Sequence, residues 1–245
     1  MMQDERPVAL ITGATGAIGK AIARQLVVEH GYEVVITARD EGKARRMVHE
    51  VGRAAGKSRI RYELVELSSR SSIYALAKRW HGPLHVLLNN AGTTPRQRLQ
   101  TPAGIELQFA TNVLGYFWMT RAFSDILKRS APARIVNVAS YWAGDLDLTD
   151  LEFKRRRYDN GIAYRQSKQA NRMLTVAFAE RLHADGVTVN VCHPGDVNSQ
   201  LSNDLGFGGH ESPDAGARTP VWLATGKEGG EQTGRYFEHM RQTIC

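Results

Sequence analysis

The chain has 245 residues, of which 42% are apolar and 23% charged, and its formal net charge is +7. These proportions are typical of a soluble globular protein and exclude a disordered chain, a coiled coil and a disulfide scaffold. No stretch approaches the roughly 18 apolar residues of a membrane span, and the N-terminus does not have the pattern of a signal peptide. The two cysteines, Cys192 and Cys245, belong to no metal-spaced cluster, so we expect a cytoplasmic protein without a metal site.

Short β-branched runs alternate along the chain with longer stretches of helical periodicity. The predicted strands are residues 8–12, 33–37, 59–65, 85–89, 134–139, 188–192 and 235–237. The predicted helices are residues 18–28, 44–51, 71–80, 102–127 and 164–183. This alternation indicates a single α/β domain over residues 1–245, a doubly wound Rossmann fold. We expect a mostly parallel, seven-stranded sheet with helices on both faces.

Two polar segments, at about 141–163 and 196–216, follow predicted strands and lack a clear period. Ligands of open parallel sheets bind beyond the carboxyl ends of the strands, so these segments are the candidate substrate loops. The basic run 154–157 is interpreted as a solvated charge run, or else as a surface that recognises an acidic carrier or substrate group. His193, at a predicted strand end, is interpreted as a structural histidine whose hydrogen bonds are satisfied.

A glycine-rich turn connects the first predicted strand to the first helix, with glycines at Gly13, Gly16 and Gly19. Glycine allows a tight turn and a close approach of the backbone to a pyrophosphate. The helix N-terminus that follows offers free N–H groups and the positive end of the helix dipole. The strand before the turn and the helix after it support a dinucleotide site.

Six segments together resemble the short-chain dehydrogenase/reductase family, most closely its retinol-dehydrogenase and carbonyl-reductase-like branch. The usual glycine motif of this family is T-G-x-x-x-G-[IL]-G, and here Ala17 takes the place of its second glycine while Gly16 lies one residue early. The other five segments are Asn89-Asn90-Ala91-Gly92, Asn112 within 111–115, Ser140 after 135–139, Tyr164-x-x-x-Lys168 and Pro194-Gly195.

Tyr164 and Lys168 are four residues apart and therefore lie on one face of the predicted helix. A nearby ammonium would lower the phenol pKa from its usual value of about 10, so that Tyr164 can exchange a proton with a carbonyl or alcohol oxygen. Ser140 could hold that oxygen. The resemblance implies that Lys168 also binds the nicotinamide ribose and that Asn112 holds a water that serves Lys168.

Arg39 follows the second predicted strand, where this fold places a residue against the adenine ribose. An acid there would select NAD, whereas arginine can bind the 2′-phosphate of NADP(H). The expected cofactor-binding residues are Gly13, Thr15, Gly16, Ile18, Gly19, Arg39, Glu66, Leu67, Asn90, Ala91, Gly92, Tyr164, Lys168, Pro194, Gly195, Val197 and Ser199.

The leading hypothesis is an NADPH-dependent oxidoreductase that reduces a small-molecule ketone or aldehyde to an alcohol, reversibly. Tyr141 and Trp142 are candidate substrate contacts, and with Leu201, Leu205 and Phe207 they suggest an apolar carbonyl compound. Alternatives are a catalytically idle NAD(P)-binding sensor or interaction protein, and an isomerase or dehydratase on the same fold. Scattered basic residues argue against a nucleic-acid binder. The resemblance leaves open a homodimer or homotetramer.

Overall fold

The structure is a computed structural model that describes residues 6–55 and 59–244. The expectation for the N-terminus therefore falls partly on residues 1–5, which lie outside the described residues, and Cys245 lies outside them as well. The strands are β1 (Val8–Ile11), β2 (Glu33–Ala38), β3 (Ile60–Leu64), β4 (Val86–Asn89), β5 (Ala133–Val138), β6 (Val187–Cys192), β7 (Tyr236–Glu238) and β8 (Arg241–Thr243). The helices are α1 (Ala17–Val28), α2 (Glu41–Ala55), α3 (Arg70–Lys78), α4 (Leu107–Phe109), α5 (Gly115–Arg129), α6 (Asn160–Leu182), α7 (Gln200–Asp204), α8 (Pro213–Thr225) and α9 (Lys227–Glu231).

The strands form one sheet in the order β3-β2-β1-β4-β5-β6-β7-β8. Every pairing is parallel except that of β7 with β8. The doubly wound Rossmann fold predicted from the sequence is thereby confirmed, but the count of seven strands is wrong. The extra strand β8 is short, polar and exposed, so it carries no hydrophobic pattern. Its hairpin turns through His239 and Met240, both at positive φ, without the Asn-Gly pair that usually marks such a turn.

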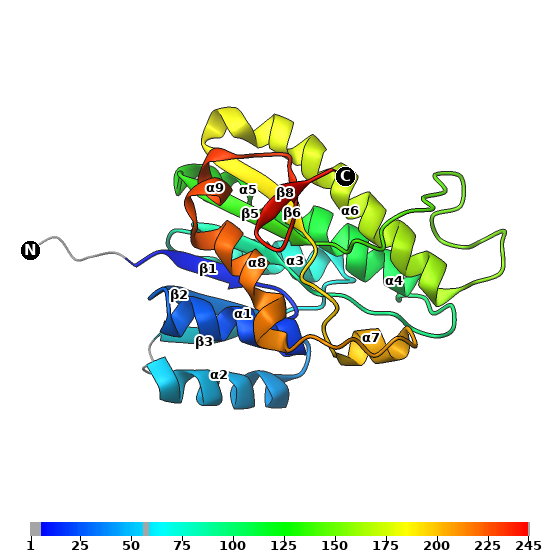
Figure 1. Cartoon of the computed structure of the whole chain (residues 1–245), viewed down its shortest axis with the longest axis horizontal. Helices are drawn as coiled ribbons and strands as arrows, with labels where there is room; N and C mark the ends of the chain where they lie inside the picture. Colours follow the sequence, from blue (N-terminus) through cyan, green and yellow to red (C-terminus); the bar gives the residue numbers. More distant parts are fainter. Residues whose placement is uncertain (1–5, 56–58, 245) are drawn as a thin grey trace, which may run out of the picture.

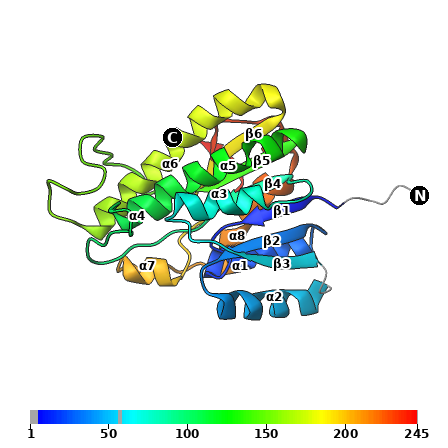
Figure 2. The same ribbon diagram turned by 180° about the vertical axis from the view of Figure 1, so that it is seen from behind.

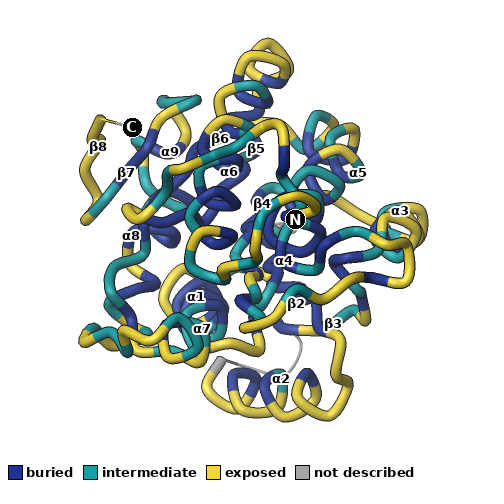
Figure 3. The backbone as a smooth tube through the Cα atoms, turned by 90° about the vertical axis from the view of Figure 1, so that its right-hand side faces the viewer, coloured by how far each residue is buried: buried dark blue, intermediate teal, exposed yellow. Residues whose placement is uncertain are grey.

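Helices cover both faces of the sheet. Helices α1, α2 and α8 lie over one face and α3, α5 and α6 over the other, as the front and back views show (Figures 1 and 2). Each face of the sheet forms a hydrophobic core with its helices, and successive residues of β2 point into different cores. Val34 and Ile36 belong to the core under α1, α2 and α8, and Val35 belongs to the core under α3, α5 and α6. Strands β4 and β6 are accordingly buried at every residue, and the buried backbone gathers in the middle of the molecule (Figure 3).

Several predicted boundaries differ from the structure. The predicted helix 102–127 starts later, at Leu107, because Thr101 and Ile105 close a turn around Gly104 at positive φ. Helix α6 begins at Asn160 instead of 164, because the Asp159 carboxylate caps it by accepting from the Ile162 N–H at 2.8 Å. The predicted loop 196–216 contains α7 and the start of α8, so it is irregular only in part. The other predicted loop, 141–163, is irregular over 141–159, because α6 takes up its end. Among the described residues, no helix combines the length and apolar character that crossing a bilayer requires.

The segment 141–159 projects from the end of the sheet where α7 also lies (Figure 1). Buried Asp150 organises it, because its carboxylate accepts from the backbone N–H groups of residues 154–156 at 2.7 to 3.2 Å. Arg156 stacks on Phe153 and donates to Gln166 at 2.7 Å. The basic run is therefore solvated only in part: Lys154, Arg155 and Arg157 are exposed, whereas Arg156 holds the segment against α6.

Candidate active site

The glycine turn connects β1 to α1 at the carboxyl end of the sheet. Gly13 has φ +68°, and a Cβ there would lie 2.6 Å from Ala91 Cα. A Cβ on Gly19 would clash with the Gly13 carbonyl and lie 2.7 Å from Ala14 Cα. At Gly16 a Cβ would meet only the Gly13 oxygen, at 3.4 Å. The outer two glycines are therefore required by close backbone approach, and the shifted middle glycine is not.

We expect Gly19→Ala to lower the free energy of unfolding by about 1–3 kcal/mol, because the added methyl group would clash with two backbone atoms and with the Asn90 amide, which is itself held by hydrogen bonds. The matched variant Gly16→Ala introduces the same methyl group into ordinary contact distance and should cost much less. Chemical denaturation of both variants measures the difference. Equal losses would show that the turn relaxes around either methyl group.

Asn90 and Thr12 hold this turn in place. The Asn90 amide donates to the carbonyls of Thr12 at 3.1 Å and Gly13 at 3.3 Å. The Thr12 hydroxyl accepts from the N–H groups of Asn90 at 3.0 Å and Ala91 at 3.1 Å. Asn90, predicted as a cofactor contact, thus uses its side chain to tie β4 to the glycine turn.

A cleft of about 410 Å³ opens over the glycine turn. Twelve of the predicted cofactor-binding residues line it: Gly13, Thr15, Gly16, Ile18, Gly19, Arg39, Glu66, Leu67, Asn90, Ala91, Gly92 and Ser199. In the part of the chain that the structure describes, no side chain caps the N-terminus of α1, so its first N–H groups are available to a phosphate. Thr37, Thr94 and Thr111 also line the cleft, and within the described residues their buried hydroxyls have no hydrogen-bond partner. Such unpaired groups, beside an uncapped helix end, fit a polar dinucleotide.

Arg39 follows β2 directly and lines the same cleft as Lys43. Its side chain is 68% exposed, and Nη1 lies 3.8 Å from the Glu66 carboxylate. The other oxygen of Glu66 accepts from the N–H and hydroxyl of Ser68, at 3.0 and 2.8 Å. Arg39 and Lys43 therefore bring two cations to the part of the cleft that follows β2, where they can pair with an anionic group such as a ribose phosphate.

Ser140, Tyr164 and Lys168 come together beyond the end of β5, and all three are more than nine-tenths buried. Ser140 lies two residues past the last residue of the strand, and α6 carries the other two. The Lys168 ammonium donates to the Val138 carbonyl at 2.9 Å and lies 5.5 Å from the centre of the Tyr164 ring. Tyr116 donates to the same carbonyl at 3.2 Å.

Burial dominates the proton affinities of this group. It raises the pKa of Tyr164 to about 12, against the lowering contribution of the Ser140 hydroxyl, and it lowers the pKa of Lys168 to about 8. The expected net lowering of the phenol pKa is therefore not found: its value lies above the usual 10, because desolvation outweighs the contributions that lower it. At neutral pH Tyr164 carries its proton, as a proton donor to a carbonyl oxygen must.

Asn112 lies in a single π-turn, residues 110–114, between α4 and α5. Such turns interrupt helices frequently at functional sites. Its amide group accepts from the Thr93 N–H at 2.9 Å, donates to the Thr93 carbonyl at 3.1 Å and reaches Ser167 at 3.3 Å. No hydrogen bond joins Asn112 to Lys168 in the described structure. Its role in holding a water for Lys168 therefore stays a prediction.

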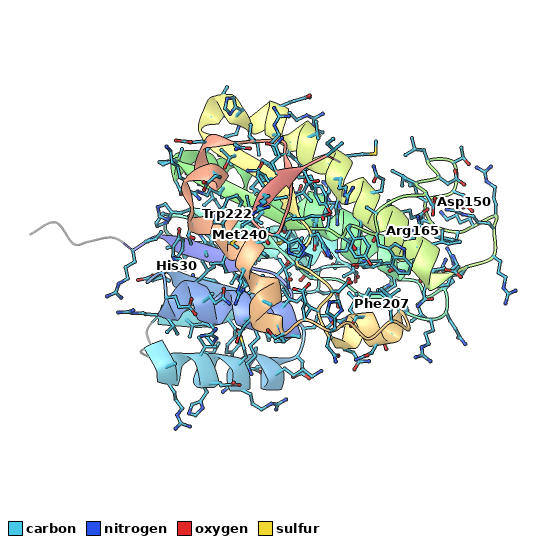
Figure 4. All side chains as sticks on the ribbon, in the orientation of Figure 1. His30, Asp150, Arg165, Phe207, Trp222 and Met240 are labelled. Carbon is cyan, nitrogen blue, oxygen red and sulfur yellow. The ribbon has the colours of Figure 1, made fainter. Side chains whose placement is uncertain are left out.

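A second cleft, of about 480 Å³, adjoins the first, with Ile18, Ser199 and Leu201 lining both. Its walls include the predicted residues Ser140, Tyr141, Trp142, Tyr164, Pro194, Gly195, Val197 and Ser199. Trp142 and Phe207 meet edge to face at 5.6 Å, and Phe207 lies beside α7 (Figure 4). Leu205, expected here, does not line the cleft, and Lys168 and Asn112 are buried and line neither cleft.

His193 also lines the second cleft and is 8% exposed, with its ring 4.8 Å from that of Tyr141. The interpretation as a satisfied histidine is wrong. Its backbone N–H donates to Phe237, but no described residue hydrogen-bonds its imidazole, and Nδ1 is wholly buried. Burial lowers the pKa of His193 to about 4.

This low pKa predicts an acid-sensitive fold. Between pH 6.5 and 4 the unfolded chain binds a proton at His193 and the folded chain does not, so stability falls as the pH falls through this window. The contribution is about 3 kcal/mol at most. His193→Asn should flatten the dependence measured by denaturation at several pH values, whereas exposed His49→Asn should not. If the free energy of unfolding varied with pH in the same way in both variants, His193 would not be the group responsible.

Sequence reasoning missed Thr93, Tyr116 and Arg172. Thr93 acts through backbone groups, which leave no signal in the sequence. For Arg172 the sequence does carry a signal, because this residue is four positions beyond Lys168 and therefore lies on the same face of α6.

Comparison with known proteins agrees with this geometry. The family model described as short chain dehydrogenase matches residues 7–206. A probable oxidoreductase of Streptomyces antibioticus is 35% identical, over 96% of this chain and 85% of that protein. Retinol dehydrogenase 13 of Mus musculus is 33% identical, over 95% of this chain and 75% of that protein.

Two solved structures are similar over nearly the whole chain. A Pseudomonas aeruginosa RhlG/NADP active-site complex has 26% identity and a TM-score of 0.76, and covers 94% of this chain and 93% of that chain. A metagenomic short-chain oxidoreductase in complex with NADP has 29% identity and a TM-score of 0.72, and covers 94% and 95%. Since the matched segment contains the glycine turn, the strand-end serine and the Tyr–Lys pair of α6, the chain belongs to the short-chain dehydrogenase/reductase family of oxidoreductases, in its retinol-dehydrogenase-like branch.

Proposed function

We propose that the protein is an NADPH-dependent carbonyl reductase that also oxidises the corresponding alcohol. One observation carries the proposal: Ser140 and Tyr164 line a cleft that adjoins the glycine-turn cleft through shared residues. A substrate oxygen held by these hydroxyls would lie next to a dinucleotide on the turn. That two of the similar solved structures are NADP complexes supports the choice of cofactor class.

The cofactor would supply the hydride, and the residues of this chain prepare the carbonyl to receive it. The Ser140 hydroxyl donates to the substrate oxygen and orients it beside Tyr164. The phenol, protonated at neutral pH, gives its proton to that oxygen as negative charge develops there. Lys168 places a cation 5.5 Å from the phenol ring and stabilises the phenolate that remains.

The alternatives predicted from the sequence fit less well. A catalytically idle sensor needs neither a proton donor nor a substrate cleft, yet both are built here. An isomerase or dehydratase on this fold would show no net oxidation of the cofactor. A panel of ketones and aldehydes, followed by the absorbance of NADPH and of NADH, separates these functions. Substrate-dependent loss of NADPH absorbance supports the proposal, and turnover without it would favour an isomerase.

We further expect the substrate to be an apolar ketone or aldehyde of more than a few carbons. Trp142, Phe207 and Leu201 give the second cleft an apolar wall. Each buried methylene contributes about 0.8 kcal/mol, so kcat/KM should rise severalfold per added methylene until the cleft is filled. Steady-state kinetics on a homologous series of methyl ketones measures the trend. A flat series, or a preference for a sugar, would contradict it.

A further inference from the structure

Arg172 is a buried arginine that the catalytic group does not yet explain. It lies two turns beyond Tyr164 and one beyond Lys168 on α6, and it is 8% exposed. Buried charges are almost always paired with an opposite charge. Within residues 6–55 and 59–244, however, no carboxylate forms an ion pair with this guanidinium, and its Nε has no hydrogen-bond partner. A charge kept at this cost suggests a specific task.

The guanidinium lies between Ser140 and strand β7, the last strand but one of the sheet. Its Nη2 donates to the Ser140 carbonyl at 2.7 Å. Its Cζ lies 3.8 Å from the centre of the Tyr236 ring, and the Tyr236 hydroxyl donates to the Glu238 carboxylate. A planar guanidinium suits this position, since it can stack on a ring and donate in its own plane at once.

The main chain around Ser140 has few other restraints. The ladder between β5 and β6 ends with the Ala139 N–H, which donates to the Cys192 carbonyl at 2.8 Å. Beyond it, and counting the described residues alone, the Ser140 carbonyl accepts one other hydrogen bond besides that of Arg172, from the Ala143 N–H at 3.3 Å. The shorter, charge-assisted bond is the stronger of the two.

We propose that Arg172 is a positioning residue that holds the Ser140 main chain, and thereby aims its hydroxyl at the substrate oxygen, while Tyr236 and Glu238 hold Arg172. This inference rests on the proposed function of the Ser140–Tyr164 pair. It makes strand β7, near the C-terminal end of the described chain, part of the support of the active site, although none of its residues lines the second cleft.

A double-mutant cycle with Ser140→Ala tests the proposal. Arg172→Met keeps most of the side-chain length but removes the charge and the donors. It should lower kcat for carbonyl reduction about tenfold or more and leave the dissociation constant of NADPH unchanged. In the Ser140→Ala background the same substitution should change kcat less than about twofold, because no hydroxyl is left to aim. An equal loss in both backgrounds, or no loss in the wild-type background, overturns the proposal.

Two further measurements keep the test decisive. Exposed Arg181→Met on the same helix is the matched control and should change nothing. NADPH binding by each variant reports whether it folds; if Arg172→Met does not fold, the cycle is run with Arg172→Lys, which keeps the charge but loses the planar fork.

Hydrogen exchange separates this proposal from the proposed function. The Trp142 N–H donates to the Ser140 hydroxyl at 3.1 Å, so loosening Ser140 should speed exchange at Trp142 severalfold. This readout needs no substrate. If the wild-type protein reduces no carbonyl, the proposed function fails and exchange at Trp142 decides the positioning role: faster exchange in Arg172→Met but not in Arg181→Met supports it, and unchanged exchange refutes it.

Discussion

Tyr164→Phe should lower kcat about 10²- to 10⁴-fold, the usual contribution of a general acid, and leave NADPH affinity nearly unchanged. The substitution removes one hydroxyl from a ring that is 7% exposed and packed beside Trp142, so it deletes the proton donor and almost no volume. Burial raises the pKa of this phenol to about 12, so the wild-type side chain is protonated at neutral pH and the substitution removes a proton donor.

Steady-state reduction of the best carbonyl in the panel, with fluorescence titration of NADPH into the same sample, measures both quantities. Tyr74→Phe is the matched control, because it makes the same chemical change on the exposed face of α3. More than about a tenth of the wild-type rate in Tyr164→Phe would mean that another group protonates the substrate.

Much of the fold and most of the site could be predicted from local patterns. The glycine turn is framed by an apolar strand and a helix, and Tyr164 and Lys168 occur at helical spacing, so each motif carries its own structural context. Twelve predicted cofactor-binding residues line one cleft for that reason.

Other features could not be predicted because they depend on tertiary contacts. The hairpin of β7 and β8 turns at His239 and Met240, two residues that carry no turn signal. The desolvation that raises the pKa of Tyr164 exists only once α6 packs against β5 and β6. The environment of Arg172 likewise requires β7, which follows it by 64 positions in the printed sequence.

The order of the motifs is therefore more informative than any single element. Gly16, one place from its usual position, leaves the turn intact because the close contacts are made by Gly13 and Gly19. A strict match to the family's glycine motif would have counted the shift of Gly16 against a dinucleotide site. The close backbone contacts, however, require glycine only at positions 13 and 19.

Arg39→Ala should weaken NADPH binding about 10- to 150-fold and leave NADH binding almost unchanged. A charged hydrogen bond to phosphate is worth about 1.5–3 kcal/mol, which corresponds to that range. Arg39 follows β2 at the rim of the glycine-turn cleft, with Lys43 beside it. Its side chain is 68% exposed and only loosely paired with Glu66 at 3.8 Å, so it can turn toward a phosphate with little to break.

The matched control is Arg46→Ala, which removes the same charge from exposed α2 without touching the cleft. Titrating NADPH and NADH into wild type and both variants gives the four affinities that matter. The salt dependence of NADPH binding should also fall in Arg39→Ala, because a screened charge contact is gone. Equal affinities of the wild type for both cofactors, or equal losses for both in Arg39→Ala, would show that Arg39 does not bind the phosphate. The cationic end of the cleft would then have to act through Lys43, the other cation at that rim.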